Sequence, residues 1–330
     1  MSHEVSRGAT LLLKLLVSTK DRTWLDRVRW SALLRARQML VRISDPVVEY
    51  DFCGTKLHLP FSHDLPIYRR TLPMYSDNLG RIAAQLSTKY GDLEIIDVGA
   101  NVGDTAALIH SRIHVPILCI EGDPRFVELL RANVAGHRPT SVVEQSFIGT
   151  SGESLIAVVH DGTARLVHTQ SNNGESIQTK SFDQILEAHP SFRGSRLLKI
   201  DTDGMDIAIL NSAYNWISRQ KPVLFFEYDP DLQRDYGSSG LKLLGKLKEV
   251  GYRRVLVYEN TGDFMCSCEL ENERLLSELH EFFSGRKSGR YCDLCIFHGE
   301  DDDIAEVVRR CELDVFRRAR HFTTADTPDV

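Results

Sequence analysis

The fold is decided by residues 95–105, which read IIDVGANVGDT. An apolar run ends in Asp97, a turn follows through Gly99 and Gly103, and a helical pattern begins at Asp104. Glycine lets the backbone turn sharply and lets a ligand approach it closely. The amide groups at the start of the helix then suit a carboxylate or another acceptor. The stretch therefore predicts a strand–turn–helix unit that binds a ligand.

Further strands and helices alternate outward from this turn. Apolar runs typical of a parallel sheet covered on both faces lie at 93–98, 117–121, 141–147, 196–201 and 223–228. Helical segments lie at 104–111, 124–135, 182–188, 206–216 and 241–250. Two later strands, 252–260 and 291–297, suit a closing pair in which one strand is antiparallel. We expect an α/β fold with a mostly parallel, seven-stranded sheet and helices on both faces.

Extensions adjoin this region at both ends. Residues 1–60 combine helical spacing with a predicted β-hairpin that turns at Cys53-Gly54, and residues 301–330 form a helical tail. The catalytic domain is then expected at 61–300. The N-terminal helices would pack on this domain or on a second subunit, so a homodimer is one expectation. Contact with a membrane surface is the alternative, because the segment is basic and carries tryptophan.

Composition excludes several classes of protein. The chain has 330 residues and a formal net charge of −6, which argues against a nucleic-acid substrate. Its 7 cysteines are scattered and odd in number, unlike a secreted disulfide framework. The apolar run 9–17 is short and interrupted by Lys14, and no stretch approaches the roughly 20 apolar residues that span a bilayer. We expect a cytoplasmic protein.

Acidic residues at strand ends indicate a positively charged ligand. A diphosphate would be repelled by Asp97, whereas the ammonium and sulfonium groups of S-adenosylmethionine would be attracted. Glu121 ends the next strand, at a spacing suited to binding ribose hydroxyls, and Phe126 begins a helix where a ring would lie along adenine. The expected cofactor-binding residues are Asp97, Gly99, Ala100, Asn101, Gly103, Thr105, Glu121 and Phe126.

A second motif, LLKIDTDGMDIAIL at 197–210, repeats this pattern, and VLFFEYDP at 223–230 places Glu227 at the end of a further strand. Ligands bind beyond the carboxyl ends of the strands in such sheets, so these acids should line one rim. A hydroxyl acceptor would need a general base. Asp201 is the first candidate and His63, on the proline-rich loop 60–78, is the second. Glu227 would hold acceptor hydroxyls or support the base.

The order of these motifs resembles the FkbM family of methyltransferases. The resemblance rests on DVGANVGDT, CIEGDPRFVELLRAN, VVEQSFIG, SFDQIL, LLKIDTDGMDIAIL and VLFFE, and it covers roughly residues 93–230. It implies a class I, Rossmann-like methyltransferase fold that uses S-adenosylmethionine. It also implies methylation of sugar hydroxyls in glycans, lipopolysaccharides or glycosylated natural products. Lys199, Asp201 and Gly204 fall in the family's second motif, where Asp203 replaces a more common Glu.

The predicted function is therefore O-methylation of a sugar hydroxyl, on a small-molecule acceptor such as a nucleotide sugar or on an oligosaccharide. The alternatives are a nicotinamide-dependent oxidoreductase, which Asp97 disfavours, and a non-catalytic module that binds the cofactor. A divalent cation is a less favoured addition, with Asp201, Asp203 and Glu227 as its ligands. Zinc at the cysteine pairs is disfavoured, because Cys292 and Cys295 should face opposite sides of a strand.

Overall fold

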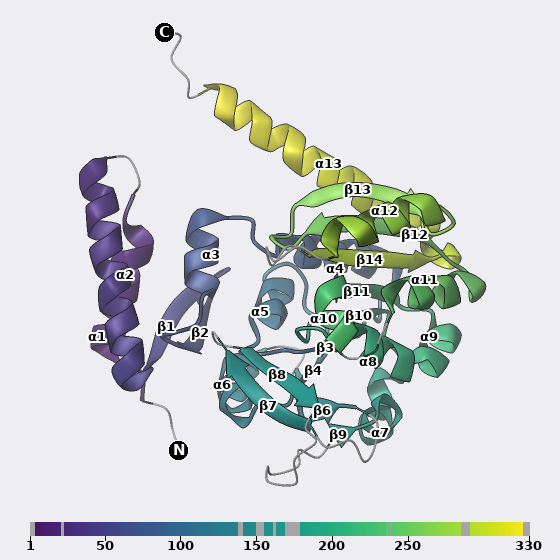
Figure 1. Ribbon diagram of the computed structural model, residues 1–330, viewed down its shortest axis with the longest axis horizontal. Helices are drawn as coiled ribbons and strands as arrows, with labels where there is room; N and C mark the ends of the chain where they lie inside the picture. The colour runs from purple at the N-terminus through teal and green to yellow at the C-terminus, as the bar shows by residue number, and fades with distance from the viewer. Residues whose placement is uncertain are drawn as a thin grey trace.

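An eight-stranded sheet runs through the centre of the molecule (Figure 1). The structure is a computed structural model that describes residues 4–20, 23–137, 141–149, 155–160, 163–168, 179–235, 237, 239–284 and 291–325. The sheet has the order β13-β12-β14-β11-β10-β3-β4-β5. Its strands are β3 (Ile95–Val98), β4 (Ile117–Glu121), β5 (Val142–Gln145), β10 (Leu197–Ile200), β11 (Val223–Tyr228), β12 (Tyr252–Glu259), β13 (Phe264–Glu269) and β14 (Cys292–His298).

Strand direction follows the predicted scheme. The strands from β5 to β11 pair in parallel, and β14 is antiparallel to both β11 and β12. The predicted number of seven strands was one too low, since β13 adds an antiparallel edge strand. The apolar run 141–147 also divides at Ser146, whose amide bonds Glu121 O at 3.1 Å. Its last part, β6 (Phe147–Ile148), pairs instead with β9 (Thr179–Lys180).

Helices cover both faces of the sheet, as predicted. One face packs against α4 (Asp77–Lys89), α5 (Asp104–His110), α6 (Pro124–Val134) and α13 (Asp302–Ala325). The other packs against α7 (Phe182–Ala188), α8 (Asp206–Ser212), α9 (Tyr214–Gln220), α11 (Gly240–Glu249) and α12 (Glu273–Phe283). The remaining elements are α10 (Pro230–Asp235), the 3₁₀ turns Pro190–Gly194 and Gly299–Asp301, and the antiparallel strands β7 (Leu155–His160) and β8 (Thr163–His168).

Two local predictions were wrong: one continuous helix at 206–216, and a cap supplied by Ser76, a residue type favoured at helix starts, to the helix that follows it. The helix expected at 206–216 is divided at Ala213 into α8 and α9. Ser76 stands before α4 but does not cap it, because its φ of 58° is left-handed and its hydroxyl makes no capping hydrogen bond. A capping serine needs an extended backbone to reach the second or third helical amide.

The N-terminal extension is helical, as the spacing predicted. It contains α1 (Arg7–Ser18) and α2 (Trp24–Ser44), which lie side by side at one end of the molecule, followed by the hairpin of β1 (Val47–Phe52) and β2 (Thr55–Pro60) (Figure 1). Cys53 and Gly54 form the predicted turn, with φ values of 51° and 81°. Asn133 on α6 joins the hairpin to the catalytic domain, since its side chain bonds His58 N at 2.8 Å and His58 O at 2.9 Å.

The proline-rich segment 60–78 is more ordered than a loop, since it contains the short helix α3 (Leu65–Thr71). Within the residues that the structure describes, none of the helices combines the length and the apolar character needed to cross a membrane.

Candidate active site

A cavity of about 480 Å³ lies at the carboxyl ends of the parallel strands. This volume is within the usual range for small-molecule sites. The cavity brings together most of the predicted site residues: His63, Gly99, Asn101, Thr105, Glu121, Phe126, Asp201, Asp203 and Glu227. Asp97, Ala100 and Gly103 are not in its lining and lie behind it.

The glycine loop is held by contacts that only glycine permits. Gly99 has a φ of 74°, and a Cβ at this position would lie 1.9 Å from the carbonyl oxygen of Asp201. The amides of Gly99 and Ala100 both bond the carbonyl of Ile120, at 3.0 and 3.1 Å. The loop therefore packs closely against the end of β10 on one side and bonds β4 on the other. Its remaining side lines the cavity.

Glu121 lies where the sequence predicted it, at the end of β4 and in the cavity wall. Its carboxylate accepts hydrogen bonds from the amides of Asn101, at 2.9 Å, and Asp123, at 2.8 Å. Burial raises the pKa of Glu121, although these amide hydrogen bonds oppose the shift. Glu121 thus ties the glycine loop to the β4–α6 turn.

Asp97 has a protein partner that the sequence analysis did not assign. Lys199 lies directly across from it on β10, with Lys199 Nζ 2.9 Å from Asp97 Oδ1 and 3.0 Å from the carbonyl oxygen of Gly99. Asp97 is fully buried, and burial raises its pKa to about 6 against the influence of Lys199. Asp97 therefore supports the glycine loop through Lys199, which contacts both Asp97 Oδ1 and Gly99 O.

The second half of the cavity is acidic. Asp201 follows β10 and its side chain is 57% exposed, whereas Glu227, at the end of β11, is 4% exposed. Asp293 on β14 lies directly opposite Glu227. Burial raises the pKa of both Glu227 and Asp293, and the neighbouring acids Asp206 and Asp201 add to each shift. Two adjacent buried carboxyls favour a protonated form, which can donate a hydrogen bond.

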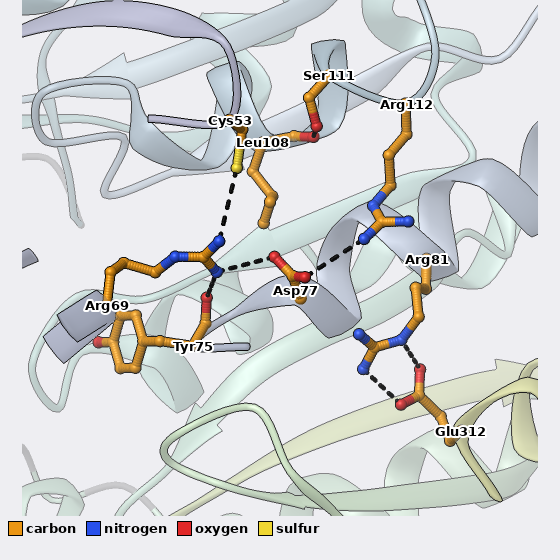
Figure 2. Close-up of polar contacts among 9 residues, drawn as sticks. All are labelled: Cys53, Arg69, Tyr75, Asp77, Arg81, Leu108, Ser111, Arg112 and Glu312. Atoms are coloured by element: carbon orange, nitrogen blue, oxygen red, sulfur yellow. Dashed lines mark hydrogen bonds and ion pairs between the residues drawn. The ribbon is translucent and has the colours of Figure 1, made fainter. Parts of the chain in front are cut away.

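Sequence reasoning missed Asp293 and Tyr291, which line this half of the cavity together with Tyr75 of the segment 60–78, a residue that the sequence suggested for sugar contacts. The sequence does contain a signal for Asp293, because this acid interrupts an otherwise apolar strand. That strand is antiparallel to β11, so its start lies at the edge of the sheet where the parallel strands end. Figure 2 shows how Tyr75 is held: Arg69 donates to its carbonyl oxygen at 2.9 Å and to Asp77 at 2.9 Å. Arg112 contacts the other oxygen of Asp77 at 3.4 Å.

His63 is held in the cavity wall by its main chain. Arg37, on α2, donates to the carbonyl oxygens of Phe61, Ser62 and His63 and to the carboxylate of Asp64. The His63 ring accepts the Leu65 amide at 3.2 Å through Nδ1. Burial lowers the pKa of His63, although Asp104 opposes the shift, so the ring is neutral at pH 7.

Within the ranges that the structure describes, no group of three or more His, Cys, Asp or Glu side chains is placed to hold a metal ion. This covers both the predicted oxygen ligands Asp201, Asp203 and Glu227 and the cysteine pairs. Cys292 and Cys295 face opposite sides of β14, as predicted, because each packs in a different apolar cluster. All seven cysteines carry free thiols.

The sheet order, the glycine loop after β3 and the acid at the end of β4 define a class I, Rossmann-like methyltransferase that uses S-adenosylmethionine. Residues 97–254 match the family model described as the methyltransferase FkbM domain. This segment is an FkbM methyltransferase domain, so the family, fold class and cofactor predicted from the sequence are confirmed. A nicotinamide-dependent oxidoreductase is accordingly disfavoured.

Among solved structures, the chain is similar to the methyltransferase FkbM from Methylobacillus flagellatus KT, with 14% identity and a TM-score of 0.37, over 86% of this chain and 58% of that one. It is also similar to an O-methyltransferase from Bacillus cereus in complex with SAH, with 11% identity and a TM-score of 0.35, over 80% and 97% of the two chains. Precorrin-6y C5,15-methyltransferase from Geobacter metallireducens GS-15 shares 10% identity, with a TM-score of 0.34, over 63% and 81%. No curated protein matches the chain.

Proposed function

We propose that this enzyme methylates a hydroxyl oxygen of a sugar, in a glycan, a nucleotide sugar or a glycosylated natural product. The observation that carries the proposal is the position of Asp201. This carboxylate is open to the cavity and lies beside two buried carboxyls, Glu227 and Asp293. A hydroxyl-rich acceptor suits such a set, because each hydroxyl both donates and accepts hydrogen bonds.

The residues of the first half of the cavity fit the cofactor. Bound S-adenosylmethionine supplies a methyl group already activated on a sulfonium. We assign Glu121 to the ribose hydroxyls and Phe126 to the adenine side, since both line the cavity beside the end of β4. Gly99, Asn101 and Thr105 would bound the amino-acid end, while Asp97, Ala100 and Gly103 support the loop from behind.

Asp201 is the proposed general base. It would accept the proton of the acceptor hydroxyl as the oxygen bonds the methyl carbon and the carbon–sulfur bond breaks, with its electron pair left on sulfur. Glu227 would donate a hydrogen bond to a neighbouring acceptor oxygen in its protonated form. His63, which is neutral and also lines the cavity, would orient the acceptor or replace Asp201 as the base.

The negative charge of the cavity argues against acceptors that carry a phosphate near the reacting hydroxyl. Its ionisable lining residues include Lys199 and the acids Asp64, Asp104, Glu121, Asp201, Asp203, Glu227 and Asp293. Lys199 is already engaged with Asp97. A phosphate close to the reacting hydroxyl would be repelled here. We therefore expect neutral sugars, or amino sugars, rather than sugars phosphorylated next to the methylated position.

An acceptor screen tests the proposal. The purified enzyme is incubated with S-adenosylmethionine and matched sets of methyl glycosides, their deoxy analogues, their phosphorylated analogues, a catechol and a short RNA. We expect a methyl mass gain on one neutral glycoside, lost when the target hydroxyl is removed. Transfer only to the catechol or the RNA would refute a sugar acceptor, and cofactor binding without any turnover would favour a non-catalytic module.

The same assay addresses the remaining predictions. Activity that persists after treatment with a chelator would remove the divalent cation as a participant, and loss with recovery on adding Mg²⁺ would restore it. The cytoplasmic location and the homodimer stay predictions.

A further inference from the structure

Helix α2 presents an exposed apolar stripe at the end of the molecule, and nothing in the proposed function uses it. Leu25, Val28, Met39 and Ile43 are each more than half exposed. With the exposed Ala32 and Ala36 they recur at steps of three and four residues, which places them on one face of the helix. Large apolar side chains that gather on an exposed face mark an interaction surface.

Basic residues border this stripe. Arg29 follows one edge, and Arg35 and Arg42 follow the other beside Trp24, which is 70% exposed. Residues 1–44 contain nine Lys or Arg against three Asp or Glu, in a chain whose net charge is −6. An apolar face bordered by arginine and tryptophan is the pattern of a helix that lies in the surface of an anionic membrane.

The other side of α2 contacts the segment that forms part of the cavity wall. Arg37 is buried, and it holds the segment 61–64 through four hydrogen bonds. Arg37 follows Val28 by nine residues, or two and a half helical turns, so the two point to opposite sides. The helix is therefore fixed to the cavity wall by one face, and its apolar face is turned to solvent.

We propose that α2 docks this enzyme on a membrane surface that carries anionic lipids. Charge favours this occupant over a second copy of the chain. In a twofold interface the same face meets itself, which would bring the arginines that border one stripe close to those of the other. Anionic headgroups would neutralise Arg29, Arg35 and Arg42 while the apolar side chains enter the lipid. Membrane docking does not depend on the acceptor assigned above.

Sedimentation with lipid vesicles tests the proposal on the full chain. Vesicles of phosphatidylcholine alone are compared with vesicles in which phosphatidylglycerol replaces part of it. We expect binding to the anionic vesicles only, weakened by salt. The double variant Val28→Asp/Met39→Asp should abolish binding, and each arginine changed to glutamine should weaken it about fivefold. Val307→Asp, at an exposed apolar position of α13, is the matched control and should bind as the wild type does.

Two companion measurements make the outcome decisive. Calorimetry with S-adenosylmethionine should give the same affinity for every variant, which shows that each is folded. Light scattering reports the oligomeric state. Equal binding to both kinds of vesicle, no binding to either, or full binding by the double variant would overturn the proposal. A wild-type dimer that the double variant converts to a monomer, without vesicle binding, would identify the stripe as a subunit interface instead.

Discussion

Lys199 and Asp97 form a buried ion pair across two neighbouring parallel strands, with Lys199 Nζ 2.9 Å from Asp97 Oδ1. The same ammonium group reaches Gly99 O at 3.0 Å and lies 3.7 Å from Asp201 Oδ2. One lysine thus connects the glycine loop, the strand before it and the proposed general base. Lys199 therefore contacts residues of both halves of the cavity, the first half assigned to the cofactor and the second, acidic half assigned to the acceptor.

Removing the lysine should destabilise the protein strongly. Lys199→Met keeps most of the side-chain volume but leaves Asp97 charged and buried without a counterion. We expect a loss of about 3–5 kcal/mol in the free energy of unfolding. The double variant Lys199→Met/Asp97→Asn should recover part of that loss, because the uncompensated charge is removed. Urea unfolding of the three proteins provides the measurement, and a Lys199→Met variant as stable as the wild type would contradict the buried pair.

Alanine substitutions at Gly99 and Gly54 distinguish the effect of a steric clash from the effect of backbone strain alone. Gly99→Ala should lose cofactor binding, since its Cβ would collide with the carbonyl oxygen of Asp201. Gly54 has a similar φ of 81°, but among the described residues an added Cβ would meet no atom within 4 Å beyond its chain neighbours. Gly54→Ala should therefore cost only about 1–2 kcal/mol of stability. Calorimetry with S-adenosylmethionine distinguishes them. Equal affinity in the two variants would show that the loop contact does not matter.

Glu121 should contribute to cofactor affinity. Glu121→Ala removes the carboxylate assigned to the ribose and also its hydrogen bonds from Asn101 N and Asp123 N. Hydrogen bonds to a charged group are worth about 1.5–3 kcal/mol, so the dissociation constant should rise roughly 10- to 150-fold. Glu187→Ala, on the exposed side of α7, is the control and should bind normally. An unchanged affinity for Glu121→Ala would remove this residue from the site.

His137, which packs against the end of α5, should make the free energy of unfolding depend on pH. His137 stacks on His110 at 4.0 Å between ring centroids, and burial followed by the charge of His110 lowers its pKa to about 4. The unfolded chain therefore binds a proton more readily, so the free energy of unfolding should fall as the pH drops from 6.5 to 4. His137 should account for a measurable part of this loss, which grows as the pH approaches 4. Urea unfolding across this range should show a smaller loss for His137→Phe, and an unchanged pH dependence would exclude His137 as its source.

The sequence predicts the sheet well because apolar runs and glycine turns are local signals. Asp97, Glu121 and Glu227 all stand at the strand ends where the pattern placed them. The partner of Asp97 could not be predicted in the same way. Lys199 is far away in sequence, and the contact depends on the register between β3 and β10. The prediction that Asp97 contacts the cofactor directly did not include Lys199, which only the tertiary structure places beside it.

The acceptor half was less predictable for a related reason. Asp293 and Tyr291 come from the last strand and the residue before it, and the antiparallel direction of that strand brings its start to the catalytic edge. Tyr75 was easier to select, because it is an aromatic residue of the segment 60–78, but its position beside Arg69 required the structure. Ser76 shows the limit of a capping rule, because its backbone is left-handed and its amide bonds Thr261 O at 3.2 Å, neither of which the residue type reveals.

The most direct test compares the wild type with Asp201→Asn for methyl transfer to the glycoside found in the acceptor screen, with cofactor affinity measured on the same samples. The proposed mechanism predicts that one methyl group is added to a sugar oxygen, that the variant is about 10²–10⁴-fold slower, and that its affinity for S-adenosylmethionine stays the same. Transfer at the wild-type rate by Asp201→Asn, or a methyl group found on an atom other than a sugar oxygen, would contradict it.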